Sequence, residues 1–163
     1  MKINSFSGTV TAINDFGITP TDENGGCYQL FTVDNGSGSI VNFVVEPTTY
    51  FVDHTMVRIG DRVTGFYDAD VPVPFIYPPQ YRTIVMAKYS PNRNVKVDFF
   101  NRNLLSSDGQ LKLNLSPQTK ILLTNGQAFR RYPANRTLVV VYDFTTKSIP
   151  AQTSPTSIIV LCH

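Results

Sequence analysis

Short runs of β-branched and aromatic residues, separated by turn residues and prolines, follow one another along most of the chain. The runs from Arg62 to Asp68 and from Arg82 to Ala87 have the length and composition of β-strands. The loop between them contains four prolines and cannot belong to a ladder, because proline has no N–H to donate. No apolar period of 3.6 residues persists beyond one or two turns, so we expect an all-β protein.

This unit of strand, proline loop and strand, residues 60–87, recurs at residues 135–162. The run from Leu138 to Asp143 matches the first strand at a shift of 75, and Ile159 to Leu161 matches Ile84 to Met86 at the same shift. Prolines again lie between the two runs. The simplest interpretation is a chain of two related halves. We predict two repeats and a short linker, residues 1–89, 95–163 and 90–94.

Earlier segments of the two halves also correspond. The alternating leucines from Leu111 to Leu115 overlie the run from Val41 to Val45 at a shift of 70. The change of shift from 70 to 75 places a five-residue insertion near residues 128–133 of the second half. Because insertions are tolerated best at the surface, we expect an exposed loop there.

Some predicted strands are apolar at consecutive positions, as in Val139 to Val141 and Ile158 to Leu161. Such a strand must be covered on both faces. A small barrel covers only the inward face of its strands, so we expect the other half of the chain to cover the outward face. The two halves are therefore predicted to pack together.

The length of each half, its number of predicted strands and the residues Ile59 to Val63 (IGDRV) before a late strand resemble the OB-fold, a five-stranded, partly open barrel. The whole chain resembles tandem OB-fold-like proteins of an uncharacterised bacterial family. The resemblance implies two five-stranded OB-like barrels packed together. The Gly-Asp turn is missing from the second half, where Ala134 to Arg136 stands. A single β-sandwich or barrel built from both halves is the alternative.

Composition narrows the function. Charged residues make up 16% of the chain and its net charge is +2, so its bulk charge does not indicate nucleic acid or an acidic lipid surface as partner. No apolar run approaches the roughly 18 residues of a membrane span, and the start lacks the apolar region of a signal peptide. We expect a cytoplasmic protein without membrane contact. Cys27 and Cys162 are expected to be reduced thiols, with a disulfide as the alternative.

Catalytic motifs are not found in the sequence. Apart from the last residue, His54 is the only histidine, so a Ser-His-Asp arrangement would rest on a turn residue. Cysteine and histidine do not cluster as zinc ligands do, and the glycine-rich turn at 34–38 lacks the lysine and helix of a phosphate loop. Asp61, Asp68 and Asp70 are expected to be solvated at a strand end. We therefore expect no catalytic residues, no metal and no cofactor.

A binding role agrees better with the sequence. Ligands of OB-folds lie across the second and third strands and the loops that join strands one to two and four to five. The second of these loops is here residues 69–81, in which Phe75, Tyr77 and Tyr81 are large side chains on a proline-stiffened loop. Such side chains commonly anchor interfaces. They either form a lid on their own barrel or contact a protein partner or a second copy of the chain.

A nucleic-acid ligand would require basic groups beside aromatic ones. The candidates are Arg130, Arg131, Tyr132, Arg102 and the pair Tyr81 and Arg82. A binder of single-stranded nucleic acid or of an oligosaccharide is therefore the second hypothesis. The first is a non-catalytic binding module that contacts a protein partner or itself through the proline and aromatic loop.

Overall fold

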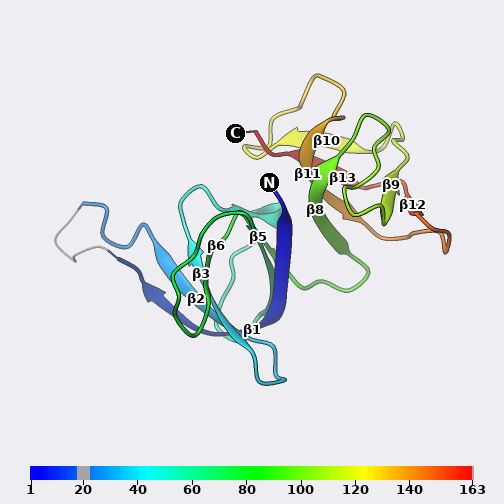
Figure 1. Ribbon diagram of the computed structural model, residues 1–163. Coiled ribbons are helices and arrows are strands. Elements are labelled where there is room, and N and C mark those ends of the chain that lie inside the picture. Colours follow the sequence, from blue (N-terminus) through cyan, green and yellow to red (C-terminus); the bar gives the residue numbers. More distant parts are fainter. Residues whose placement is uncertain (18–22, 163) are drawn as a thin grey trace. The chain divides into compact units, whose positions relative to one another are not determined.

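The structure is a computed structural model and describes residues 1–17 and 23–162. These ranges contain thirteen β-strands, a single 3-10 turn at Val52–His54 and no α-helix (Figure 1). The all-β class expected from the sequence is therefore confirmed. The chain divides into two compact units, residues 1–89 and 90–163, which are described separately below. His163, the last residue of the second predicted repeat, lies outside the described residues.

The first unit is organised around its long first strand, β1 (Ile3–Asp15). The second half of β1 pairs antiparallel with β2 (Gln29–Asp34), and its first half pairs antiparallel with β5 (Arg62–Asp68) (Figure 1). β2 continues the sheet by pairing antiparallel with β3 (Ile40–Val45). One strand therefore connects a three-stranded meander to the strand that follows it much later in the sequence.

The two ends of this sheet are held by consecutive stretches of chain. β6 (Gln80–Arg82) pairs parallel with β3, and β7 (Val85–Lys88) pairs antiparallel with β5. Only Thr83 and Ile84 separate β6 from β7, and their N–H groups donate to carbonyls at the ends of β3 and β5 at 3.0 and 2.9 Å. The ladder thus runs through β1, β2, β3, the β6–β7 segment and β5 back to β1. A short strand, β4 (Tyr50–Phe51), adds to β7 in parallel.

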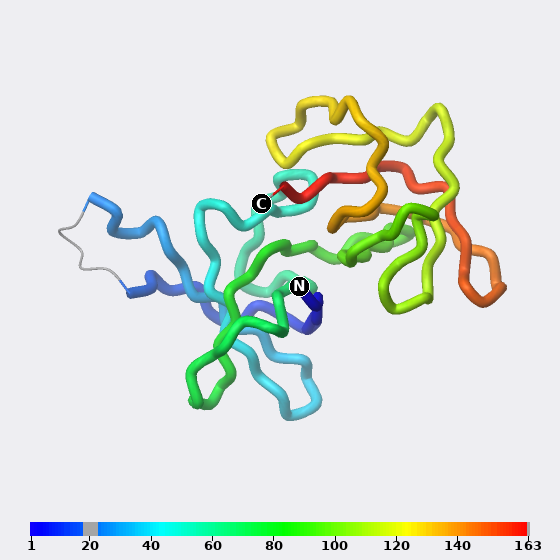
Figure 2. The backbone as a smooth tube through the Cα atoms, turned by 45° about the horizontal axis from the view of Figure 1, so that its top comes forward, coloured from blue at the N-terminus to red at the C-terminus, as the bar shows by residue number. Residues whose placement is uncertain are grey.

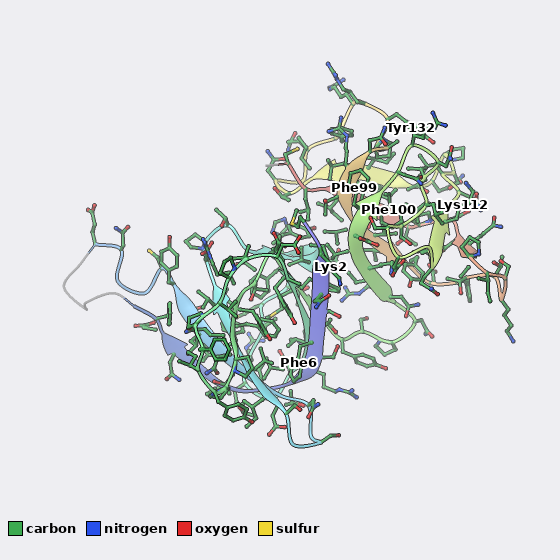
Figure 3. The ribbon with its side chains drawn as sticks, in the orientation of Figure 1. Lys2, Phe6, Phe99, Phe100, Lys112 and Tyr132 are labelled. Atoms are coloured by element: carbon green, nitrogen blue, oxygen red, sulfur yellow. The ribbon has the colours of Figure 1, made fainter. Side chains whose placement is uncertain are left out.

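The interior of this ring is filled by aliphatic and aromatic side chains. Phe43 is completely buried, and its ring lies against the backbone of Gly65, where an added Cβ would come within 2.5 Å of Cζ. The rings of Phe6, labelled in Figure 3, and Tyr67 lie 6.5 and 6.3 Å from it. Because glycine has no Cβ, Gly65 leaves room for the Phe43 ring. The inner core consists of Val10, Phe31, Val33, Val41, Phe43, Val45, Val57, Val63 and Met86.

In the second unit, three strands form the antiparallel order β8, β11, β13, and β10 extends β13 in parallel. β9 and β12 form a separate parallel pair. On β8, Phe100 is completely buried and its neighbour Phe99 is partly exposed, because successive side chains of a strand point to opposite faces (Figure 3). The strands are β8 (Asn94–Phe100), β9 (Leu111–Leu113), β10 (Lys120–Leu123), β11 (Arg136–Tyr142), β12 (Ala151–Thr153) and β13 (Ser157–Val160).

The inner core of the second unit is aliphatic apart from Phe100. Leu138 and Val140 of β11 belong to it, whereas Val139 and Val141 point to the opposite face and are buried as well. The predicted burial of β11 on both faces is thus observed. The core residues are Phe100, Leu104, Leu111, Leu113, Leu138, Val140, Ile158 and Val160.

One threonine in each unit makes the same set of side-chain hydrogen bonds. The hydroxyl of Thr49 donates to the Thr83 carbonyl at 2.8 Å, and the hydroxyl of Thr119 donates to the Pro155 carbonyl at 2.7 Å. Each threonine hydroxyl also accepts from the N–H three residues earlier. Thr49 and Thr119 are therefore equivalent positions of the two units, and their separation of 70 residues agrees with the predicted shift.

Backbone bonds between the later strands correct one predicted correspondence. The N–H of Ile84 donates to the Phe66 carbonyl, and the N–H of Thr156 donates to the Val141 carbonyl, each at 2.9 Å. Phe66 and Val141 differ by the predicted 75 residues, but Ile84 and Thr156 differ by 72. The predicted match of Ile159 to Ile84 is therefore wrong by three residues. The cause is the proline loop, which is three residues shorter in the second unit.

Candidate functional site

The loop of residues 69–79 is fixed at both of its ends. At its start, the N–H of Ala69 donates to the Lys2 carbonyl at 2.7 Å, and at its end the Pro79 carbonyl accepts from the Asn42 N–H at 2.8 Å. Four prolines hold φ near −65° between these points. The loop, green in Figure 2, consequently projects from the first unit with little freedom to rearrange.

The tip of this loop is apolar and exposed. The Phe75 side chain is completely exposed, and Tyr77 and Ile76 are 74% and 54% exposed. Their backbone N–H groups donate no hydrogen bond to any described residue. Of the two predicted roles, the lid would require these side chains to lie on the sheet of their own unit. They do not lie there in the structure.

Tyr81 lies away from this exposed tip, contrary to its grouping with Phe75 and Tyr77. It belongs to β6, and its ring stacks on Tyr67 with the centroids 3.9 Å apart and an interplanar angle of 6°. Both rings pack against the inner core of the first unit. Burial, and then the neighbouring Tyr81, raise the pKa of Tyr67 above its ordinary value.

Arg82 also lies on β6, and its charge is already paired. Its Nε and Nη2 lie 2.7 and 2.5 Å from Oε1 of Glu46. The Glu46 side chain is only 17% exposed, whereas that of Arg82 is 71% exposed. Because a mostly buried carboxylate neutralises this guanidinium, Arg82 is a weaker phosphate ligand than its sequence position suggests.

A pocket with a volume of about 550 Å³ is bounded by the loop and the ends of β3 and β6. Its lining includes residues 71–74 of the loop, Val44 and Glu46, and the stacked rings of Tyr67 and Tyr81. Every lining residue belongs to the first unit. The pocket therefore combines an apolar and aromatic lining with the Arg82–Glu46 ion pair, the Asp68 carboxylate and Met1, which suits an amphipathic occupant that can donate hydrogen bonds.

One polar group in the lining of this pocket is unsatisfied. Thr83 is 4% exposed, and its hydroxyl has no hydrogen-bond partner among the described residues. A buried hydroxyl without a partner costs about 1–3 kcal/mol. The neighbouring Thr49 makes two hydrogen bonds, so the two threonines differ in what they contribute to stability.

The remaining predicted site residues belong to the second unit. Arg130, Arg131 and Tyr132 are exposed in the inserted loop, and Tyr132 is labelled in Figure 3. Arg102, in another loop of the same unit, is exposed as well. None of the four lines the pocket of the first unit. The predicted binding residues thus fall into four places: the loop tip, β6, the inserted loop and the loop that contains Arg102.

Two exposed apolar residues of the second unit, Phe144 and Ile149, were not expected from the sequence. At the shift of 72, Ile149 corresponds to Tyr77, and both precede a proline across a cis peptide bond. Ile149 is 94% exposed and Phe144 is 83% exposed, in the loop drawn in orange in Figure 2. The recurrence of proline at positions 78 and 150 was the signal that could have found them.

The sequence also did not single out Tyr28, Glu46 and Tyr67 as lining residues. These residues lie far apart in the chain and come together only because the ladder of the first unit closes on itself. A periodic pattern of apolar residues predicts strands but not which strand ends meet. No local signal could have found this pocket.

Metal binding, cysteine chemistry and histidine chemistry have little support in the described parts of the chain. They contain no group of three or more His, Cys, Asp or Glu side chains that could hold a metal ion. Cys27 and Cys162 are free and exposed. The His54 ring lies edge-on to Tyr50 with the centroids 5.5 Å apart, so it packs as an aromatic group.

Comparison with known proteins adds no assignment. No protein family, no curated protein and no solved structure matches the chain. Across residues 1–17 and 23–162, no helix is long and apolar enough to cross a membrane. Functional inference therefore rests on the loop, the pocket and the inserted loop described above.

Proposed function

We propose that each unit is an OB-like barrel. The connections of the first unit support this proposal, because β1, β2 and β3 form a meander and the last strand segment pairs with both β3 and β5. The second unit repeats the pairings of β1 with β5 and of β5 with β7 as β8 with β11 and β11 with β13. A solenoid-like stack of β-units is the alternative, but a stack would not return through residues 80–88 from β3 to β5 and so to β1.

We further propose that the protein is a non-catalytic binding module, whose loop tip contacts a protein partner or a second copy of the chain. The observation that carries this proposal is the complete exposure of Phe75 beside Ile76 and Tyr77 on a loop fixed at both ends. Clustered exposed apolar side chains mark interaction sites. A stiff loop loses little entropy on contact, which favours binding.

The decisive test replaces Phe75 and Tyr77 together with Ala. We expect the melting temperature to change little, because both side chains are exposed, and we expect association with protein partners, or self-association, to be lost. Met56→Ala is the matched control, because Met56 is an exposed apolar residue outside the loop. A double variant that keeps every association of the wild-type protein would remove the loop from the functional account.

Single-stranded nucleic acid is the second candidate, because Arg130, Arg131 and Tyr132 are exposed side by side in one loop. The pairing of Arg82 with Glu46 weighs against it by removing one phosphate contact. A fluorescence titration with single-stranded DNA and RNA at two salt concentrations tests this candidate. Submicromolar affinity that falls steeply with salt and is lost in Arg130→Ala with Arg131→Ala would place it first.

A further inference from the structure

The loop of residues 69–79 contains both a protruding apolar tip and one side of an apolar pocket. Residues 71–74 line the pocket, and the next residues, Phe75 to Tyr77, point away from it into solvent. The apolar tip, which could enter a pocket, and the pocket lining, which could receive such a tip, are thus adjacent in a single loop. This adjacency limits which occupant the pocket can take.

The tip does not fill the pocket of its own chain. Phe75 directly follows Pro74, which lines the pocket, and the Phe75 side chain is completely exposed. Prolines 72 and 74 fix φ and hold the residues before them extended, so the backbone cannot fold back within one residue. Any tip that enters this pocket must therefore belong to another molecule.

The tip and the pocket match in charge and in hydrogen-bonding capacity. Residues 71–79 carry no charged side chain. The charged side chains of the lining are the paired Arg82 and Glu46 and the Asp68 carboxylate, which accepts from the N–H groups of Lys2 and Asp70. The backbone N–H groups of Phe75, Ile76 and Tyr77 lack partners among the described residues, while Glu46, Gln80 and Tyr67 place polar groups in the lining. An uncharged, aromatic segment with free backbone donors suits this lining better than a charged ligand does.

Resting on the proposed function, we propose that the partner is a second copy of this chain, with the Phe75 to Tyr77 tip of each copy in the pocket of the other. Because tip and pocket share one loop, a two-fold axis near that loop satisfies both contacts at once. Each aromatic side chain buries about 150–250 Å², so Phe75 and Tyr77 of two copies bury about 600–1,000 Å². Pocket walls and prolines supply the remainder of the about 1,200–2,000 Å² of a stable interface.

A complementation experiment tests this reciprocal insertion. Phe75→Ala removes the tip and leaves the pocket intact, and Thr48→Trp places a bulky ring in the pocket lining at an exposed position that leaves the tip intact. Sedimentation equilibrium gives the dissociation constant of each protein and of their mixture. We expect each variant alone to associate about tenfold or more weakly than the wild type. The mixture, which regains one insertion of two, should associate more tightly than either variant alone.

Two outcomes would overturn the proposal. One is a wild-type protein that is monomeric at the highest accessible concentration. The other is a mixture that associates no better than its two components, which would indicate a contact without insertion. Met56→Ala and Met56→Trp, at an exposed position outside the pocket, are the controls and should associate as the wild type does. A monomeric protein that still loses a different protein partner on Phe75→Ala would contradict the insertion and leave the proposed function in place.

Discussion

The two units share one hydrogen-bonded frame and differ in what fills and decorates it. Thr49 and Thr119 make the same side-chain bonds, and Phe66 and Val141 accept the same backbone bond. In the frame, however, position 43 is Phe against Gly65, whereas the equivalent positions of the second unit are Leu113 and Val140. In the same frame, a large residue against glycine in one unit thus corresponds to two aliphatic residues of intermediate size in the other.

The loops differ more than the frames. Eleven residues separate Asp68 from Gln80, and eight separate the equivalent Asp143 from Gln152. The longer loop both lines a pocket and carries three clustered apolar residues at its tip, whereas the shorter loop exposes Phe144 and Ile149. Specific function is therefore expected to reside in the loop of the first unit rather than in the shared frame.

The largest expected effect compares two phenylalanines of the first unit. Phe43→Ala should lower the free energy of unfolding by about 3–5 kcal/mol, because a fully buried ring is lost. Phe75→Ala, the same change in the exposed tip, should alter it by less than about 0.5 kcal/mol. Urea denaturation of both variants at a concentration where the protein is monomeric measures the difference. Equal losses would show that the tip is buried in solution.

A double-mutant cycle sharpens the comparison of the two cores. Gly65→Val alone should cost about 1–3 kcal/mol or more, because its Cβ would approach Phe43 to 2.5 Å. Adding Phe43→Leu recreates the Leu and Val combination of the second unit and should recover part of that loss. Thermal and urea denaturation of the two single variants and the double variant give the coupling energy. Strictly additive losses would contradict the equivalence of the two core positions.

Substitutions of threonine by valine test the shared hydrogen bonds. Thr49→Val and Thr119→Val should each cost about 1–2 kcal/mol, because each leaves a backbone carbonyl and a backbone N–H without their side-chain partner. Thr83→Val should be neutral or stabilising, because it removes a buried hydroxyl that has no partner. Denaturation of the three variants ranks them. A large loss for Thr83→Val would indicate that its hydroxyl is satisfied in solution, for example by water.

The smallest expected effect is on the pH dependence of stability and involves Asp108 of the second unit. Burial acts to raise the pKa of Asp108, but hydrogen bonds from Lys96 and Ser106, each at 2.6 Å, lower it overall below the ordinary 3.8. The stabilisation is present above the unfolded pKa and disappears as the pH falls through the lower folded value. Asp108→Asn should therefore flatten the dependence of unfolding free energy on pH below about pH 4. An unchanged slope would show that this carboxylate titrates alike in both states.

The sequence predicted what depends on local pattern. The all-β class, the strand at Leu138 to Tyr142 and its shift of 75 follow from periodic apolar residues, and the inserted loop follows from the change of shift. The match of Ile159 to Ile84 failed because one apolar β-branched run resembles another at several offsets. The ladder bonds of Ile84 and Thr156, and the registers of β5 with β7 and of β11 with β13, distinguish the offset of 72 from that of 75.

The candidate site was predicted only in part. Proline content identified the loop and Phe75, because torsional restriction is a local property. The stacking of Tyr81 on Tyr67 and the pairing of Arg82 with Glu46 depend on the closure of the ladder, which joins residues more than ten positions apart. Such contacts leave no trace in the periodicity of one sequence, so the sequence predicts neither the packing of Tyr81 against the core nor the neutralisation of Arg82 by Glu46.

The placement of β5 between β1 and β7 has a mechanical consequence. Ile3 pairs with Asp68 at one end of β5, and Lys88 pairs with Val63 at the other, so the first unit begins and finishes at opposite ends of this strand. A force that pulls these two points apart acts parallel to the strands. It loads the bonds of both ladders together in shear instead of opening them one by one, so this unit should resist stretching along the chain more strongly than a hairpin pulled open from its ends.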